Sequence, residues 1–218
     1  IESGDGETPY FTDASVKKEQ GIILEEYLMY QDLPEQRIYY GLLKNMYNNH
    51  PIHTEILGTD ESIMKITAHK LYQAYHTFYH PSNMVLTVIG NFNKDEILSL
   101  IDENQQNKNY KPEPPIQRFL PKEPMRLAHR EETIYMSVSM PYVGIGVKLK
   151  PKADLKALYK QSLTISLIMA MYFGDGGIIY NDLLKKGIIN QSFKYGIADY
   201  ENALSIILYG MTPKEEDF

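Results

Sequence analysis

The amino-acid sequence predicts an α+β protein in which helices pack on mostly antiparallel sheets. Three observations lead to this fold class. Several segments repeat apolar residues at helical spacing, as Ile38, Leu42 and Met46 do. Residues 83–91, NMVLTVIGN, form a compact run rich in β-branched side chains, which is typical of a buried strand. After a proline-rich segment, the mixture of helical and strand patterns begins again.

Composition excludes several classes of protein. The 218 residues carry a net charge of −6 without a basic cluster, which argues against nucleic acid as the main partner. The chain has no cysteine, so any metal must be held by His, Asp or Glu, and a reducing, cytoplasmic location is favoured. No run approaches the ~18 apolar residues of a membrane span. The closest, residues 163–173, is expected to be a core helix, and we expect no membrane partner.

Residues 16–32 form the most informative segment, a predicted helix with Thr12 or Asp13 as its N-cap. Two of its carboxylates, Glu19 and Glu26, lie two turns apart on the same face, within an apolar arc. Helical carboxylates are usually solvated. A carboxylate buried in an apolar arc, however, is costly unless it is paired, hydrogen-bonded or bound to a metal. We therefore expect a special role for this pair.

The rest of the first half alternates helical patterns with one strand. The predicted elements are a helix over 34–49, a short turn at 60–62, a helix over 66–80 capped by Thr67, the strand over 83–91 and a helix over 94–107 capped by Asn93. His50 and His53 flank Pro51 in an irregular connection and are expected at the surface. His76 and His80 have helical i, i+4 spacing but lack the Glu of a zincin helix, so we interpret His80 as a residue at the helix end.

A linker is predicted over residues 108–126, which contain five prolines and little periodicity. The second half then begins with two strands on either side of Pro141. These two strands lie at 132–140 and 144–150. They are followed by a long apolar helix at 154–174 capped by Asp154, a turn at GDGG, a shorter helix at 178–187 closed by Gly187, and a pair of strands within 189–210. GDGG lacks the Lys and Ser/Thr of a phosphate-binding loop, so we interpret it as a turn.

The segment VKKEQGIILEEYLMYQDLPEQRIYYGLL resembles the pitrilysin/insulinase family of inverted-zincin metallopeptidases. HPIHTEILGTDESIMKIT and FYHPSNMVLTVIGNF follow in the same order as in that family, and YFGDGGIIYNDLLKKGIINQSF resembles the opening of its second repeat. In the family, two histidines of an H-x-x-E-H helix and a glutamate of a later helix bind zinc. Matched residue by residue, the resemblance makes Glu26 the later zinc ligand and gives Glu19 a supporting role that orients a histidine ligand.

The H-x-x-E-H motif itself is absent, and only 25 residues precede Glu26. The resemblance therefore implies a piece of a larger protein. Residues 1–107 would be the C-terminal half of a first repeat, and 127–218 the N-terminal half of a second. We expect this piece to be inactive by itself, with one zinc ligand and no catalytic residue. The Arg and Tyr that often anchor substrate in the second repeat are missing near LLKKGIIN, so no substrate-binding residue is carried over.

The resemblance implies that the intact protein is a zinc-dependent metallopeptidase. Within the family, the sequence is most similar to the bacterial processing-peptidase-like members. The intact protein would cleave peptides or unfolded proteins with a metal-activated water. An alternative is a non-catalytic subunit of the same fold that recruits or shapes substrate beside a homologous subunit or a second copy. A third, more distant alternative is a helical interaction module without a metal site. That alternative predicts that Glu19 and Glu26 are solvent-exposed.

Overall fold

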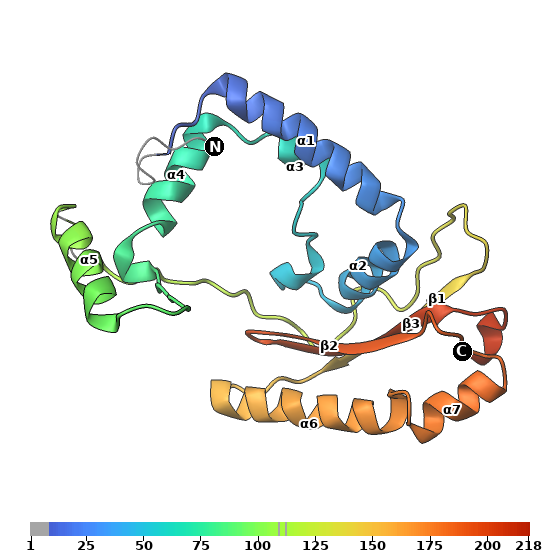
Figure 1. The fold of residues 1–218 in the computed structure, drawn as a ribbon. Helices are drawn as coiled ribbons and strands as arrows, with labels where there is room; N and C mark the ends of the chain where they lie inside the picture. The colour runs from blue at the N-terminus through green and yellow to red at the C-terminus, as the bar shows by residue number, and fades with distance from the viewer. Residues whose placement is uncertain (1–8, 109, 112) are drawn as a thin grey trace. The chain divides into compact units, whose positions relative to one another are not determined.

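The computed structural model describes residues 9–108, 110–111 and 113–218. Figure 1 shows the elements, which in chain order are α1 (Asp13–Gln31), α2 (Pro34–Met46), α3 (Asp60–Met64), α4 (Ala68–Phe78), α5 (Lys94–Gln106), β1 (Tyr142–Leu149), α6 (Leu155–Phe173), α7 (Ile178–Lys185), β2 (Lys194–Tyr200) and β3 (Ala203–Met211). Short 3-10 turns occupy Pro51–His53, Pro81–Asn83 and Glu215–Asp217.

Four predicted helix starts are confirmed by their caps. Each cap side chain accepts a hydrogen bond from a backbone N–H in the first turn of its helix, at 3.1 Å for Thr12, 3.3 Å for Thr67, 3.0 Å for Asn93 and 2.8 Å for Asp154. These bonds satisfy N–H groups that have no partner within the helix. Local chemistry alone therefore sets where these helices begin.

The chain divides into two units whose boundary falls within α1. The first comprises residues 1–20 and 65–119. Within it, the N–H of Phe11 donates to the hydroxyl of Tyr72 at 3.0 Å, and the side chain of Gln20 donates to the carbonyl of Ile66 at 2.9 Å. Val16 is its one buried residue among those described.

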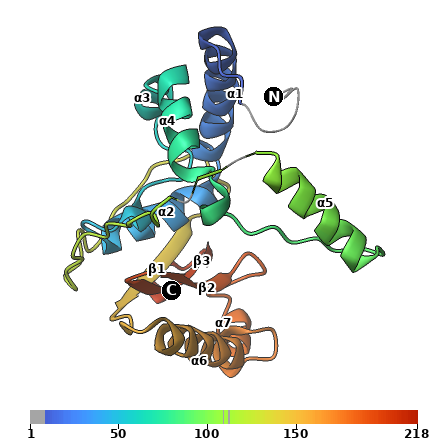
Figure 2. The ribbon, with the colours of Figure 1, turned by 90° about the vertical axis from the view of Figure 1, so that its left-hand side faces the viewer.

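The second unit comprises residues 21–64 and 120–218 and contains a three-stranded antiparallel sheet in the order β1-β3-β2. Helix α2 covers one face of the sheet, and α6 lies against the other (Figures 1 and 2). The core lies between α2 and the sheet and consists of Leu43, Met46, Tyr47, Ile52, Ala198, Ala203 and Ile207. The predicted α+β class, with helices packed on an antiparallel sheet, is confirmed.

Two predicted strands are wrong. Within the described part of the chain, residues 83–91 and 132–140 form no strand, and Val85 and Tyr135 are each 93% exposed. A strand is stabilised by hydrogen bonds to a neighbouring strand, and no described segment pairs with either run. A run of β-branched residues is therefore not sufficient to form a strand without a neighbouring strand to pair with.

The described residues of 108–126 form no helix or strand, as expected of a linker. The division into repeats at 107 and 127 stays a prediction.

Helix α6 is less buried than the expected core helix. It buries Leu158, Ser162 and Met169, while Leu155 and Met171 are each 71% exposed. Residues Leu155–Lys185 are long and apolar enough, by length and composition, to cross a membrane, although core helices of soluble proteins pass the same test. The turn between α6 and α7 interrupts this stretch. We therefore interpret α6 as a helix that packs on the sheet along one side.

Candidate functional site

Both carboxylates singled out on α1 are exposed. Their apolar neighbours Ile22 and Met29 are 50% and 54% exposed, and Val16 is the only buried residue of the helix. The expectation that Glu19 and Glu26 are held within a buried apolar arc is therefore wrong for this chain. The reason is that helical spacing defines a face but does not supply a partner to cover it. This exposure is what the interaction-module alternative predicts.

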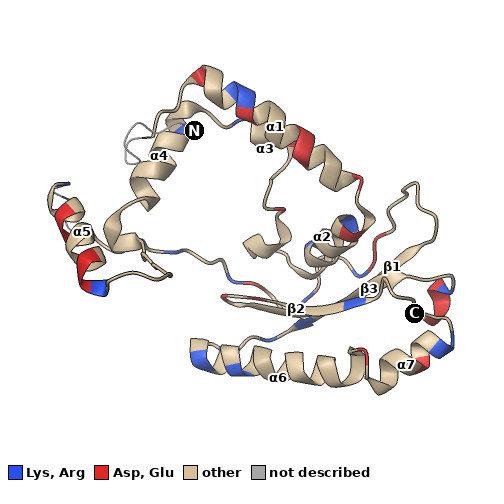
Figure 3. Cartoon of the chain, in the orientation of Figure 1, with Lys and Arg blue, Asp and Glu red and all other residues tan. Residues whose placement is uncertain are grey.

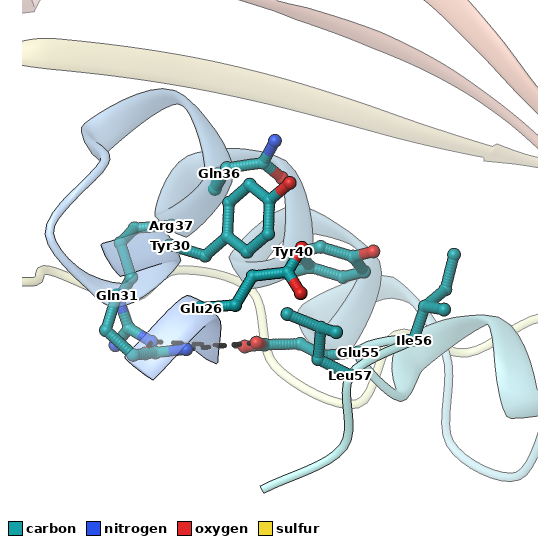
Figure 4. Close-up of a pocket in the computed structure, with 9 residues that line it drawn as sticks. All are labelled: Glu26, Tyr30, Gln31, Gln36, Arg37, Tyr40, Glu55, Ile56 and Leu57. Atoms are coloured by element: carbon teal, nitrogen blue, oxygen red, sulfur yellow. Dashed lines mark hydrogen bonds and ion pairs between the residues drawn. The ribbon is translucent and has the colours of Figure 1, made fainter. Parts of the chain in front are cut away.

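Glu26 nevertheless points into a hollow of about 270 Å³ (Figure 4). Its walls come from α1, from α2 and from the connection after α2, through Tyr30, Gln31, Gln36, Arg37, Tyr40, Glu55, Ile56 and Leu57. Two tyrosine rings and two aliphatic side chains make this hollow largely apolar. The carboxylate of Glu26 has no hydrogen-bond or ion-pair partner among the described residues, so its oxygen atoms are free to bind a cation.

The second carboxylate of the hollow is already engaged. Gln31 donates from Nε2 to Oε2 of Glu55 at 3.0 Å, and Arg37 donates from Nη1 to the Gln31 side-chain oxygen. The same Nη1 lies 4.0 Å from Oε1 of Glu55. These three side chains form one polar wall, which leaves Glu26 as the available acid. Sequence reasoning missed Arg37 and Glu55, because no motif in the chain marks either residue.

The connection that carries Glu55 is fixed at its start by a buried ion pair. The carboxylate of Glu123 accepts the N–H groups of Asn48, Asn49 and His50 at 3.0, 2.7 and 2.8 Å, and the ammonium of Lys148 also donates to it. The Glu123 and Lys148 side chains are 6% and 3% exposed. Burial favours a higher pKa for Glu123, but the hydrogen bonds outweigh it and lower the pKa to about 2. This carboxylate is therefore ionised at neutral pH.

His50 fixes the same connection from the other side, and its predicted surface position is wrong. It is 4% exposed, accepts the N–H of Ile52 at Nδ1 and lies 2.8 Å through Nε2 from the carbonyl oxygen of Glu201. Since the carbonyl only accepts, Nε2 carries the proton. Glu201 is 151 residues away in the sequence, so no local pattern could reveal this contact.

The residues of this chain do not by themselves fit a zinc ion. Within the part of the chain that the structure describes, no three His, Asp or Glu side chains gather closely enough to hold a metal. Zinc in proteins takes at least three protein ligands. Glu26 can supply one of them, whereas Glu19 lies two turns earlier and does not line the hollow. The roles of Glu26 as ligand and Glu19 as its support stay predictions.

Comparison with known proteins gives consistent matches. The family model described as "Peptidase M16 inactive domain" matches residues 65–217, a range that does not include Glu26. An uncharacterized zinc protease of Bacillus subtilis, YmfH, is 40% identical over 210 residues, which cover 95% of this chain and 49% of that protein. A second zinc protease of the same species, YmxG, is 36% identical over 81 residues, covering 37% of this chain and 20% of that protein.

Solved structures show the same fold. A crystal structure assigned to the M16-like peptidases, from Alicyclobacillus acidocaldarius, matches with a TM-score of 0.86 and 35% identity, over 94% of this chain and 49% of that one. A protease from Helicobacter pylori matches with a TM-score of 0.70 and 16% identity, over 93% and 48% of the two chains, which shows the fold alone. The chain thus spans about half the length of YmfH and of both these structures.

Proposed function

Because this chain belongs to the peptidase M16 family, we propose that it is the part of a zinc metallopeptidase that supplies one zinc ligand and a non-catalytic domain. The observation that carries the proposal is the carboxylate of Glu26, which points into a largely apolar hollow and has no partner among the described residues. The named zinc protease relatives support both the metal and the hydrolysis of peptide bonds. The intact protein would act on peptides or unfolded proteins, as the processing-peptidase-like resemblance implies.

The remaining ligands and the general base would come from sequence outside this chain, because the residues described here do not complete a metal site. Zinc would supply an activated water when bound to the whole protein. Glu26 would donate one carboxylate oxygen to the metal, and Glu19 would orient a histidine ligand. Family membership argues against the module without a metal site, although the exposure of both carboxylates fits it. The absence of cysteine agrees with the cytoplasmic location that we propose.

The test measures zinc in the intact protein. We expect about one zinc per polypeptide in the wild type, loss of most of this zinc in Glu26→Gln, and roughly 10–100-fold weaker zinc affinity in Glu19→Gln. The matched control is Glu25→Gln, which changes the adjacent exposed carboxylate and leaves the zinc content unchanged. Elemental analysis after gel filtration gives the stoichiometry, and cleavage of an unfolded fluorescent casein gives the activity. Full zinc occupancy in Glu26→Gln would show that this residue is not a ligand.

One observation favours a second candidate, the non-catalytic partner subunit. The family model that matches residues 65–217 is the inactive domain type. If the intact protein binds no zinc but increases the cleavage rate of a zinc-containing homologue when the two are mixed, the partner role replaces the first proposal. If it binds zinc and cleaves casein alone, the partner role is excluded.

A further inference from the structure

The turn between α6 and α7, where Figure 3 shows an acidic residue, contains Asp175 followed directly by Gly176. Because glycine has no Cβ, its main-chain nitrogen can approach the side chain of a preceding aspartate more closely than that of any other residue. Among the described residues, no other aspartate is followed by glycine. A second Asp-Gly pair, at residues 5–6 of the sequence, lies outside the described residues. Within the described chain, this turn is therefore where an aspartate most readily reacts with its own main chain.

The two groups that would react are exposed and have no partner. Within the part of the chain that the structure describes, neither the carboxylate of Asp175 nor the N–H of Gly176 is hydrogen-bonded. The N–H of Gly177 donates to the carbonyl of Gly174 at 2.7 Å, which makes residues 174–177 a β-turn with Asp175 and Gly176 at its centre. A Cβ at Gly176 would meet nothing within 4 Å, so the surroundings of the reacting nitrogen are open.

One side chain of α7 restrains this turn. Nδ2 of Asn181 donates to the carbonyl oxygens of Asp175 and Gly177, at 3.1 and 2.9 Å. The approach of the Gly176 nitrogen to Cγ of Asp175 depends on rotation about the Cα–C bond of Asp175. That rotation also moves the carbonyl oxygen of Asp175 away from Asn181, so it breaks the first hydrogen bond. Asn181 should therefore keep the turn in its unreactive conformation most of the time.

We propose that Asp175 is a site of spontaneous conversion to isoaspartate and that the hydrogen bonds of Asn181 control the rate. The nitrogen of Gly176 attacks Cγ of Asp175, and a C–N bond forms. One carboxyl oxygen leaves as water with the proton of the carboxyl group and the proton of the nitrogen, which gives a five-membered succinimide. Water then adds to either ring carbonyl and breaks its C–N bond, which restores aspartate or yields isoaspartate. The reaction needs no metal, so it is independent of the proposed zinc site.

The conversion alters how α7 is attached to α6. In isoaspartate the main chain runs through the former side chain, so the β-turn becomes one carbon longer. A Cβ at Gly177 would clash with the carbonyl oxygen of Tyr172, which shows that Gly177 packs closely against the end of α6. The longer turn cannot keep this packing and both hydrogen bonds of Asn181 at once. Isomerisation should therefore loosen the start of α7, and hydrogen exchange at the N–H of Asn181 should become faster.

The experiment incubates the intact protein at neutral pH in water enriched in oxygen-18 and digests it with trypsin in ordinary water. Cleavage after Lys160 and Lys185 releases residues 161–185, which contain the turn. We expect a second chromatographic form of this peptide that carries one oxygen-18 atom. Electron-transfer fragmentation should place the isoaspartate at Asp175 and not at Asp182.

Three variants test the control by the structure. Asn181→Ala removes both hydrogen bonds and should speed isomerisation by about fivefold or more, since a single hydrogen bond shifts such an equilibrium by roughly this factor. Its matched control is Ile178→Ala in the same helix, which changes a side chain that is 79% exposed and should react like the wild type. Gly176→Ala should be slower by roughly an order of magnitude, because its Cβ hinders the attacking nitrogen.

A further measurement does not depend on how the variants fold. A synthetic peptide of residues 172–179 contains the Asp-Gly pair but not Asn181, and it should isomerise at least about fivefold faster than the folded wild type. Equal rates in the peptide and the protein, or in the wild type and Asn181→Ala, would overturn the proposal. So would oxygen-18 uptake at this peptide no greater than in Asp175→Glu, whose longer side chain cannot close the five-membered ring.

Discussion

The buried carboxylate of Glu123 allows a direct test of which interactions stabilise the second unit against unfolding. We predict that Glu123→Gln weakens the second unit, because it removes the negative charge that accepts three consecutive N–H groups at the end of α2. It also leaves the ammonium of Lys148, 3% exposed, without its carboxylate. The carbonyl oxygens of Met46 and Pro124, each 2.7 Å from this ammonium, compensate only in part.

The size of the effect follows from the pKa of Glu123. Its value of about 2, against an ordinary value of 4.5, corresponds to about 3 kcal/mol of unfolding free energy at 1.36 kcal/mol per pKa unit. Breaking a buried ion pair typically costs about 3–5 kcal/mol, which agrees. Because the pKa is lower in the folded state, this stability is fully present above pH 4.5 and is lost as the pH falls toward 2.

Two assays measure the prediction. Urea unfolding followed by far-ultraviolet circular dichroism should give a difference of about 3 kcal/mol between wild type and Glu123→Gln at pH 7, and this difference should shrink between pH 4.5 and 2. Hydrogen exchange should show lost protection at the amides of Asn48, Asn49 and His50, which identifies the site of the change.

The matched control is Glu35→Gln, which removes the partner of Lys194 in an exposed pair with side chains 39% and 52% exposed. Exposed pairs contribute about 0–1 kcal/mol, so this variant should unfold almost like the wild type. The reasoning is refuted if Glu123→Gln costs no more than Glu35→Gln at pH 7. It is equally refuted if the difference between wild type and Glu123→Gln stays constant down to pH 2.

The remaining predictions concern backbone positions in the same unit. Gly210→Ala should lower the free energy of unfolding, measured in urea, by about 1–3 kcal/mol, because its Cβ would lie 2.8 Å from the main-chain Cα of Phe193. For the control Gly176→Ala, whose Cβ would meet nothing within 4 Å, the free energy of unfolding should change by no more than about 0.5 kcal/mol. Equal midpoints for these two variants would contradict the close packing of β3 on Phe193. Asn202 has φ 63° in the turn between β2 and β3. Asn202→Ala should therefore cost about 1 kcal/mol and Asn202→Gly almost nothing, and a lower thermal midpoint for the glycine variant would count against this conformation.

Much of the secondary structure could be predicted because its causes are local. Thr67, Asn93 and Asp154 are followed by helical periodicity and cap helices in the structure, and Gly187, with φ 65°, closes α7 as predicted. The pair β2 and β3 is joined by a two-residue turn, so each strand finds its partner nearby in sequence. The resemblance of residues 16–92 to the metallopeptidase family was likewise present in the sequence itself, and the 40% identity to YmfH over 95% of this chain confirms the family.

The candidate site could be predicted only in part. The sequence pointed to Glu26, but the wall formed by Gln31, Arg37 and Glu55 depends on a connection folding back beside α1 and α2. Helical periodicity also could not predict that Glu26 is exposed, because it shows which residues share a helix face but not whether another element packs against that face.

The sequence by itself determined the family, the helices and their starts, and the hairpin of β2 and β3, whose strands are neighbours in the sequence. Only the tertiary structure decided which β-branched runs become strands, since residues 83–91 and 132–140 have the composition but no pairing partner among the described residues. It also decided which polar groups are buried: His50 and Glu123 are enclosed because their partners come from distant parts of the chain. The physical reason is the same in both cases. Caps and turns are satisfied within a few residues, whereas strand pairing and buried charge require groups that the chain brings together only when it folds.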